Sequence, residues 1–224
     1  MMVTTAQPAR VNELFRLSDA NLADLSARVK LEVHRRTLAE TIQAGSEIVG
    51  LEMAKRVITV AAAGSHSVVF VGREGSGKTM LRALAARLGL TDTFEVRPCP
   101  CGNHGDVHHA CRCTERQFLA HRKKWPRADL FCEVVAPSDR EFRFPSRPTG
   151  IDEVRHVIQA RGPVPHQLDS AAESLLSHAI RELGPCPATV ATIRRVAQTV
   201  AALDRADIVT SSHLNEAINY RMPD

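Results

Sequence analysis

Residues 72–79, GREGSGKT, have the spacing G-x-x-x-x-G-K-[ST] of a phosphate-binding loop, or P-loop. The glycines of a P-loop let successive backbone N–H groups curve around phosphate oxygens, and the positive end of the following helix dipole points at them. Lys78 is expected to reach the β- and γ-phosphates of a nucleotide, and the Thr79 hydroxyl is expected to bind Mg²⁺. The pattern therefore predicts binding of ATP or ADP with Mg²⁺. The residues expected at the nucleotide are Gly72, Glu74, Gly75, Ser76, Gly77, Lys78, Thr79 and Met80.

The alternative for this segment is a turn of the same shape that is kept for folding and binds no ligand. Glu74 places a negative charge inside the loop, which is expected to weaken its affinity for an anion. The flanking sequence favours binding, because the loop lies between an apolar strand candidate at residues 67–71 and an amphipathic helix candidate at residues 80–88.

Four of the six cysteines form two C-x-C pairs, with nine residues between the pairs. They are Cys99, Cys101, Cys111 and Cys113. Four thiolates suit a tetrahedral Zn²⁺ ion and leave no open position, so the expected site is structural. Folding of the loop at residues 98–114 is then expected to be coupled to metal binding. A reduced loop without metal is the alternative.

The other cysteines and the histidines of this loop are expected to stay outside the metal site. His104, His108 and His109 could each replace one sulfur, but four cysteines already fill the shell, so these imidazoles are predicted to be solvated. Cys132, in an apolar segment, and Cys186, between two prolines, are predicted to be packing residues.

Composition is that of a soluble globular protein, since 44% of the 224 residues are hydrophobic and 24% are charged. No apolar run approaches the roughly 20 residues of a membrane span, and the first residues lack a signal peptide, so we expect a cytoplasmic protein without membrane contact. The net charge of +4 does not by itself indicate nucleic acid. A basic patch at residues 112–127 is either a solvated helix face or a contact for DNA phosphates. The basic patch consists of Arg112, Arg116, Arg122, Lys123, Lys124 and Arg127.

Strand and helix candidates alternate around these motifs, as in an α/β protein. A helix at residues 53–63 precedes the continuous apolar strand at 67–71, and a short strand at 93–97 leads into the first cysteine pair. A polar helix at 114–123 and another strand at 129–135 follow the second pair.

The rest of the chain is predicted to be helical apart from one long loop. Residues 11–44 have a helical pattern without a catalytic or binding motif. Residues 136–150 are predicted to form a loop rich in proline and arginine. Helices at about 188–203 and 211–221 end the chain. The predicted domains are an amino-terminal helical segment at 1–46, a P-loop core with the cysteine loop at 47–136, and a helical lid at 149–224.

Five stretches carry a resemblance beyond any single motif: GLEMAKRVITVAAAGSHSVVFVGREGSGKTML, RPCPCGNHGDVHHACRC, PRADLFCEV, RRVAQTVAAL and HLNEAINYR. In this order, from about residue 50 to residue 221, they resemble the magnesium-chelatase-like AAA+ ATPases of the ComM and YifB type. The resemblance implies an α/β P-loop core with a helical lid and assembly into ATP-driven hexamers. For the ComM type it also implies branch migration on DNA during natural transformation.

Three catalytic groups of that family have no counterpart here. Only residues 80–98 separate the P-loop from CPCG, and after one helix they leave room for one strand, so no strand with a Walker B acidic pair fits. The family's sensor 1 asparagine is Arg97, and its sensor 2 arginine falls on Ala188. Asp92 or Glu95 could replace the Walker B acid, and the spacing favours neither.

The resemblance also implies a strand order and one catalytic arginine. An AAA+ sheet has the order 5-1-4-3-2, so loss of strands 2 and 3 leaves a three-stranded parallel sheet of order 5-1-4 with residues 67–71 at its centre. The strand at 93–97 then has an open edge, which we expect the amino-terminal helices or a second protomer to cover. Arg127 aligns with the arginine that acts across a subunit boundary.

These observations predict a reduced AAA+ module that binds nucleotide with little or no hydrolysis. It is expected to act as a switch or regulatory partner, in a homo-oligomer or beside a full-length AAA+ relative, in DNA processing. One alternative is a zinc-stapled interaction or DNA-binding protein with a vestigial P-loop. Another is an active ATPase subunit of a DNA motor.

Overall fold

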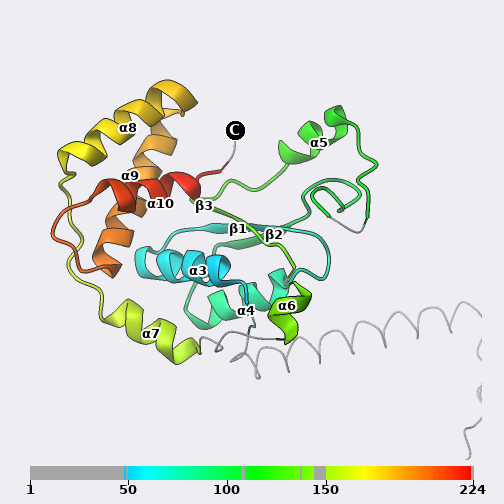
Figure 1. The fold of residues 1–224 in the computed structure, drawn as a ribbon, viewed down its shortest axis with the longest axis horizontal. Coiled ribbons are helices and arrows are strands. Elements are labelled where there is room, and N and C mark those ends of the chain that lie inside the picture. Colours follow the sequence, from blue (N-terminus) through cyan, green and yellow to red (C-terminus); the bar gives the residue numbers. More distant parts are fainter. Residues whose placement is uncertain (1–47, 49, 107–108, 137, 144–149, 223–224) are drawn as a thin grey trace, which may run out of the picture. The chain divides into compact units, whose positions relative to one another are not determined.

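A three-stranded parallel sheet lies at the centre of the computed structural model (Figure 1). β1 (Val68–Val71) lies between β2 (Thr93–Val96) and β3 (Leu130–Glu133), and all four residues of β1 are buried. The predicted parallel sheet with the apolar run of residues 67–71 at its centre is therefore confirmed. The structure describes residues 48, 50–106, 109–136, 138–143 and 150–222.

Two helices cover one face of the sheet (Figure 1). α3 (Glu52–Gly64) packs on β3, and α4 (Lys78–Arg87), which follows the P-loop, packs on β2. α3 buries most of its residues because it lies between the sheet and the carboxy-terminal helices. The P-loop thus joins a buried strand to the end of a helix that is packed on the neighbouring strand.

The tail consists of four helices: α7 (Ile151–Gln159), α8 (Ser170–Leu183), α9 (Pro187–Leu203) and α10 (Ser211–Asn219). α9 packs on both α3 and α10. Buried apolar residues of the tail belong to the same core as those of β1 and α3. The predicted division between a P-loop core and a lid domain stays a prediction, because this core runs through both.

Polar contacts fix α9 at the amino ends of the strands. Nε2 of His66, just before β1, lies 2.9 Å from Oγ1 of Thr199. Asp129, just before β3, accepts a hydrogen bond from Nη2 of Arg195 at 2.8 Å. These two contacts attach α9 at the end of the sheet opposite the P-loop, which follows the carboxyl end of β1.

Two shorter helices flank β3 in the sequence, α5 before it and α6 after it. α5 (Glu115–Arg122) begins with a capping box between Thr114 and Gln117 and buries none of its residues. α6 (Asp139–Arg143) lies in the segment that we predicted to be a loop, so that prediction is wrong at these residues. Ser138 and Glu141 explain the helix, because Ser138 Oγ accepts from the Glu141 N–H at 3.3 Å while the Glu141 carboxylate accepts from the Ser138 N–H at 2.7 Å.

Some predictions concern residues that the structure does not describe. The amino-terminal helical segment at 1–46 lies outside the described residues, and so does His108. Within the described part of the chain, β2 pairs only with β1, and coverage of its outer edge stays a prediction. No helix among the described residues is long and apolar enough to span a membrane.

Candidate functional site

The P-loop backbone has the conformation that a phosphate cradle needs. Gly75 and Gly77 have φ angles of 81° and 96°, which disfavour any residue with a Cβ. Gly77 is the N-cap of α4, and within the described chain no side chain caps this helix. The first N–H groups of α4 are therefore left available to an anion.

Ser76 is a buried polar residue of the P-loop. Its side chain is fully buried, and its Oγ has no hydrogen-bond partner among the described residues. A buried hydroxyl without a partner costs free energy, so a site that supplies one on ligand binding is consistent with this arrangement. Met80, which we also expected at the nucleotide, is 39% exposed on the first turn of α4.

Lys78 is folded back onto the loop. Its Nζ donates to the carbonyl oxygens of Gly72 at 2.8 Å and Arg73 at 2.6 Å. Burial lowers the pKa of Lys78, although the nearby Glu95 carboxylate opposes this shift. To reach a phosphate, the ammonium group must exchange these two carbonyl oxygens for phosphate oxygens.

Side chains of β2 and the residue after it lie beside the P-loop. The Thr79 hydroxyl donates to Oε2 of Glu95 at 3.0 Å. Nη2 of Arg97 lies 3.2 Å from Oε2 of Glu74. The Glu74 charge, expected to weaken anion binding, is thus partly offset by Arg97.

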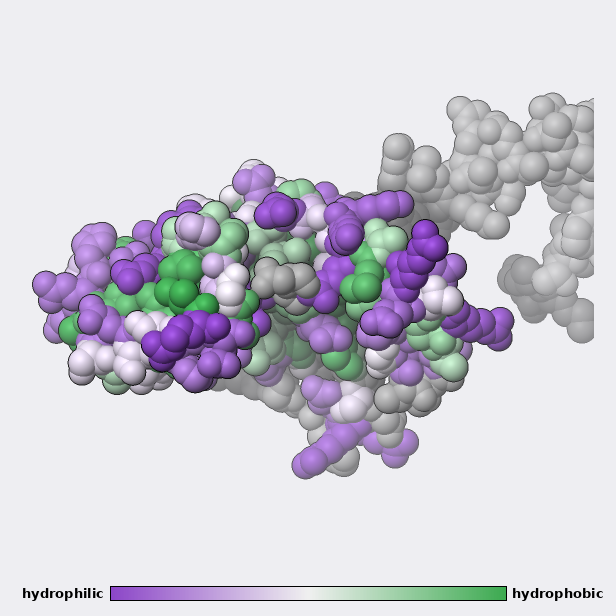
Figure 2. Space-filling view, turned by 90° about the horizontal axis from the view of Figure 1, so that it is seen from above, coloured by the Kyte–Doolittle hydropathy of each residue, from purple (hydrophilic) through white to green (hydrophobic). Residues whose placement is uncertain are grey.

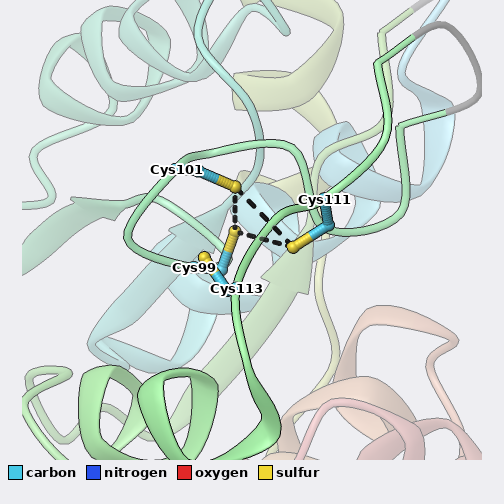
Figure 3. A group of neighbouring side chains, drawn as sticks. All are labelled: Cys99, Cys101, Cys111 and Cys113. Atoms are coloured by element: carbon cyan, nitrogen blue, oxygen red, sulfur yellow. Dashed lines mark hydrogen bonds between the residues drawn. The ribbon is translucent and has the colours of Figure 1, made fainter.

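The four predicted zinc ligands come together (Figure 3). All four sulfur atoms lie within 4.8 Å of one another. The sulfur of Cys99 lies 3.4 Å from that of Cys101 and 3.7 Å from that of Cys111, and the last two are 3.7 Å apart. A tetrahedron with zinc–sulfur bonds of about 2.3 Å has sulfur atoms about 3.8 Å apart, so the spacing fits zinc.

The local backbone favours the thiolate form at Cys101, whereas burial and the neighbouring sulfur atoms raise the pKa of Cys111 and of Cys113. Hydrogen bonds from the backbone of Asn103, and then of Arg112, lower the pKa of Cys101 to about 6. A thiol with this pKa is mostly ionised at neutral pH, so less free energy is needed to release its proton on metal binding.

The described histidines of the loop are engaged away from the sulfur atoms. The His104 ring lies against Phe118, with ring centroids 4.4 Å apart, and Nδ1 of His109 lies 3.1 Å from Asp106. The same Asp106 carboxylate forms an ion pair with Arg73 of the P-loop at 2.6 Å, and its side chain is only 2% exposed. The cysteine loop and the P-loop are therefore joined through Arg73 and Asp106.

The remaining cysteines divide into one confirmed prediction and one correction. Cys132 is buried in β3, as expected of a packing residue. Cys186 is exposed, so the prediction that it packs is wrong. It is the N-cap residue of α9, with Pro187 in the first turn, and residues 186–188 at this end of the helix are all exposed.

Two sequence comparisons bear on the family. Residues 45–96 match the family described as "Magnesium chelatase, subunit ChlI", and residues 156–221 match "Magnesium chelatase, subunit ChlI C-terminal". The chain is also 53% identical over 36 residues to "Competence protein ComM" of Haemophilus influenzae (strain ATCC 51907 / DSM 11121 / KW20 / Rd). The chain belongs to the magnesium-chelatase-like proteins of the ComM type.

The ComM match covers 16% of this chain and 7% of that relative. The first family match contains β1, the P-loop, α4 and β2, and the second contains α8, α9 and α10. In this magnesium-chelatase-like chain, β2 follows α4 directly, and residues 78–97, which the structure describes throughout, contain no other strand.

Arg127 of the magnesium-chelatase-like chain lies far from its own P-loop. It lines a hollow of about 520 Å³ together with Ser67, Trp125 and Ala188, the residue at the sensor 2 position. Figure 2 shows the surface recessed between the part that carries α5 and the part that carries the carboxy-terminal helices. Ser67 precedes β1 and the P-loop follows it, so a strand of about 13 Å separates the hollow from the P-loop.

The basic patch begins before α5, at Arg112, and continues along and after this helix. Five of its six side chains are exposed, and Arg122 is partly buried. Exposure is compatible with a solvated face and with contact to nucleic-acid phosphates, so DNA binding stays a prediction for this magnesium-chelatase-like chain.

Proposed function

We propose that this chain is a nucleotide-binding module that holds ATP or ADP with Mg²⁺ and hydrolyses ATP very slowly. The observation that carries the proposal is the P-loop itself: an uncapped α4 amino end follows two glycines in the left-handed region, with Lys78 and Thr79 in its first turn. This cradle binds phosphate through its own backbone and two side chains. It needs no Walker B residue to do so.

Slow hydrolysis follows from the groups that are missing around the cradle. Phosphoryl transfer depends on positioning and on stabilising charge in the transition state. Loss of one group that acts only there commonly costs about 2.7 to 4 kcal/mol, or roughly 10²- to 10³-fold in rate. Residues 78–97, which the structure describes throughout, contain no strand besides β2 to carry a Walker B pair. Arg97 and Ala188 stand at the expected sensor 1 and sensor 2 positions.

The cysteine cluster is proposed to hold a structural Zn²⁺ ion. Its four thiolates fill a tetrahedral shell, so the ion supplies a cross-link between the two ends of the loop and no open position for chemistry. The Arg73–Asp106 ion pair transmits this order to the P-loop. The zinc is therefore proposed to support nucleotide binding indirectly.

A module of this kind works as a switch or regulatory partner. Because Arg127 lies away from its own P-loop, it is proposed to act on another subunit, either a second copy or a full-length AAA+ relative. The matched segment spans only 7% of the length of "Competence protein ComM". A role in DNA processing is proposed on that likeness alone.

Thermal unfolding with and without nucleotide tests the proposal. MgADP or MgATP at about 100 times its Kd is expected to raise the melting temperature by roughly 5 to 10 °C. Lys78→Ala should abolish the rise, because it removes the charge that meets the phosphates. Lys124→Ala, which removes an exposed charge of the basic patch, should preserve it. No rise at millimolar nucleotide would leave a zinc-stapled scaffold with a vestigial P-loop.

A further inference from the structure

An acidic side chain, that of Glu95, contacts Thr79, the residue expected to bind Mg²⁺. Its Oε2 accepts a hydrogen bond from the Thr79 hydroxyl at 3.0 Å, and its Oε1 lies 3.7 Å from Nη1 of Arg82. The side chain is 22% exposed, so it is partly shielded from solvent but open to a ligand in the P-loop.

Sheet register explains why Glu95 and not Asp92 occupies this place. Glu95 pairs with Phe70, near the carboxyl end of β1 where the P-loop begins. Asp92 precedes β2, and its carbonyl oxygen accepts from the Val68 N–H at the amino end of β1. The two acids, which the sequence spacing did not distinguish, therefore lie at different ends of a parallel strand pair.

The chemistry around Thr79 suits an ion. Mg²⁺ in nucleotide sites is held by one or two protein oxygens, phosphate oxygens and several waters, and a carboxylate often orients one of those waters. Without an ion, the Thr79 hydroxyl donates its proton to Glu95. If Mg²⁺ were bound, the Thr79 hydroxyl oxygen would be available to hold it, and the Glu95 carboxylate could accept a hydrogen bond from water on the ion.

We propose that Glu95 of β2 is the acidic Mg²⁺ partner of this P-loop, in place of a Walker B residue. The inference rests on the proposed nucleotide binding. It adds that the effect of Glu95 on nucleotide affinity is unfavourable without Mg²⁺ and favourable with it. Without Mg²⁺, the Glu95 charge repels the phosphates that Lys78 attracts. With Mg²⁺ between them, the same charge stabilises the complex. Glu95 therefore makes nucleotide binding depend strongly on the ion.

Isothermal titration of ADP in excess Mg²⁺ and in EDTA tests this inference through binding alone. The gain is defined as the dissociation constant of ADP in EDTA divided by that in Mg²⁺. Glu95→Gln keeps the shape of the side chain and an oxygen for Thr79, and it should reduce the gain by about 10- to 100-fold. It should also bind ADP in EDTA more tightly than the wild type does. Asp92→Asn, which removes the same charge at the other end of β2, should leave the gain unchanged.

The outcomes separate the inference from the proposal on which it rests. If the wild type binds ADP with a gain that Glu95→Gln retains in full, the assignment of Glu95 is wrong and nucleotide binding stands. If the wild type binds ADP in neither buffer, the proposed function fails. Circular dichroism of each variant establishes that it is folded, and electron paramagnetic resonance with Mn²⁺ and ADP gives an independent measure of ion binding.

Discussion

Lys78 and Cys186 both lie at the amino end of a helix, but their surroundings leave the first engaged in hydrogen bonds and the second accessible to solvent. Lys78 begins α4 with its ammonium group bound to two carbonyl oxygens, which a phosphate would have to replace. Cys186 is the N-cap residue of α9. Its thiol is exposed, and the sulfur lies 3.3 Å from the Thr189 hydroxyl oxygen. The Lys78 ammonium group is thus engaged within the loop, whereas the Cys186 thiol is accessible to reagents.

Cys186 is expected to be the most reactive thiol of the zinc-loaded protein. The Thr189 side chain, its backbone N–H and the Arg127 charge lower the pKa of Cys186, so more thiolate is present at neutral pH than for an ordinary cysteine. Cys132 should be inert, because burial raises its pKa to about 12. Alkylation with iodoacetamide, followed by peptide mass spectrometry across a pH series, should show Cys186 modified first and with a midpoint below that of an unperturbed thiol.

Thr189→Val is the matched variant for this prediction. It removes the hydroxyl near the thiolate and should move the midpoint for Cys186 to higher pH. Modification of Cys186 that is no faster at neutral pH than that of cysteines in the urea-unfolded protein would contradict the assigned environment.

At the scale of elements, the cysteine loop and the P-loop are linked by one ion pair. Asp106 is nearly buried, so the Arg73 charge that neutralises it stabilises both loops. Metal removal is expected to disorder residues 98–114 and to release this ion pair. Because Arg73 is 38% exposed, the effect on the P-loop should be modest, about 1 kcal/mol or roughly fivefold in ADP affinity.

Hydrogen exchange with and without a chelator measures this coupling. Faster exchange is expected in residues 98–114 and also in residues 72–79. Arg73→Ala with zinc retained should weaken ADP binding by a similar factor while residues 98–114 stay protected. Exchange that rises only within the cysteine loop would contradict the coupling.

Most elements could be predicted because their signals are local. The apolar run of residues 67–71 indicated a central strand, and the C-x-C spacing indicated a cluster, because neither depends on distant residues. α6 was missed although Ser138 and Glu141 form a capping box, since the surrounding prolines and arginines favoured a loop. The position of Glu95 could not be predicted, because it depends on the register of β2 against β1.

At the scale of the whole molecule, the attachment of α9 bears on what one chain can do. α9 is held at the amino ends of the strands by Thr199 and Arg195, so the hollow with Arg127 lies a strand's length from the P-loop. A single magnesium-chelatase-like chain of this form has its phosphate cradle and its candidate arginine at opposite ends. Complementation between subunits is therefore expected for any turnover.

The central claim is that ATP is held without efficient turnover, and a single-turnover experiment tests it most directly. With protein in excess over labelled ATP and Mg²⁺, the nucleotide should be captured and yet recovered as ATP, with a rate constant for hydrolysis below about 10⁻³ s⁻¹. Lys78→Ala should fail to capture it. Conversion of bound ATP to ADP at about 1 s⁻¹ or faster, abolished by Lys78→Ala, would contradict the claim and identify a working ATPase.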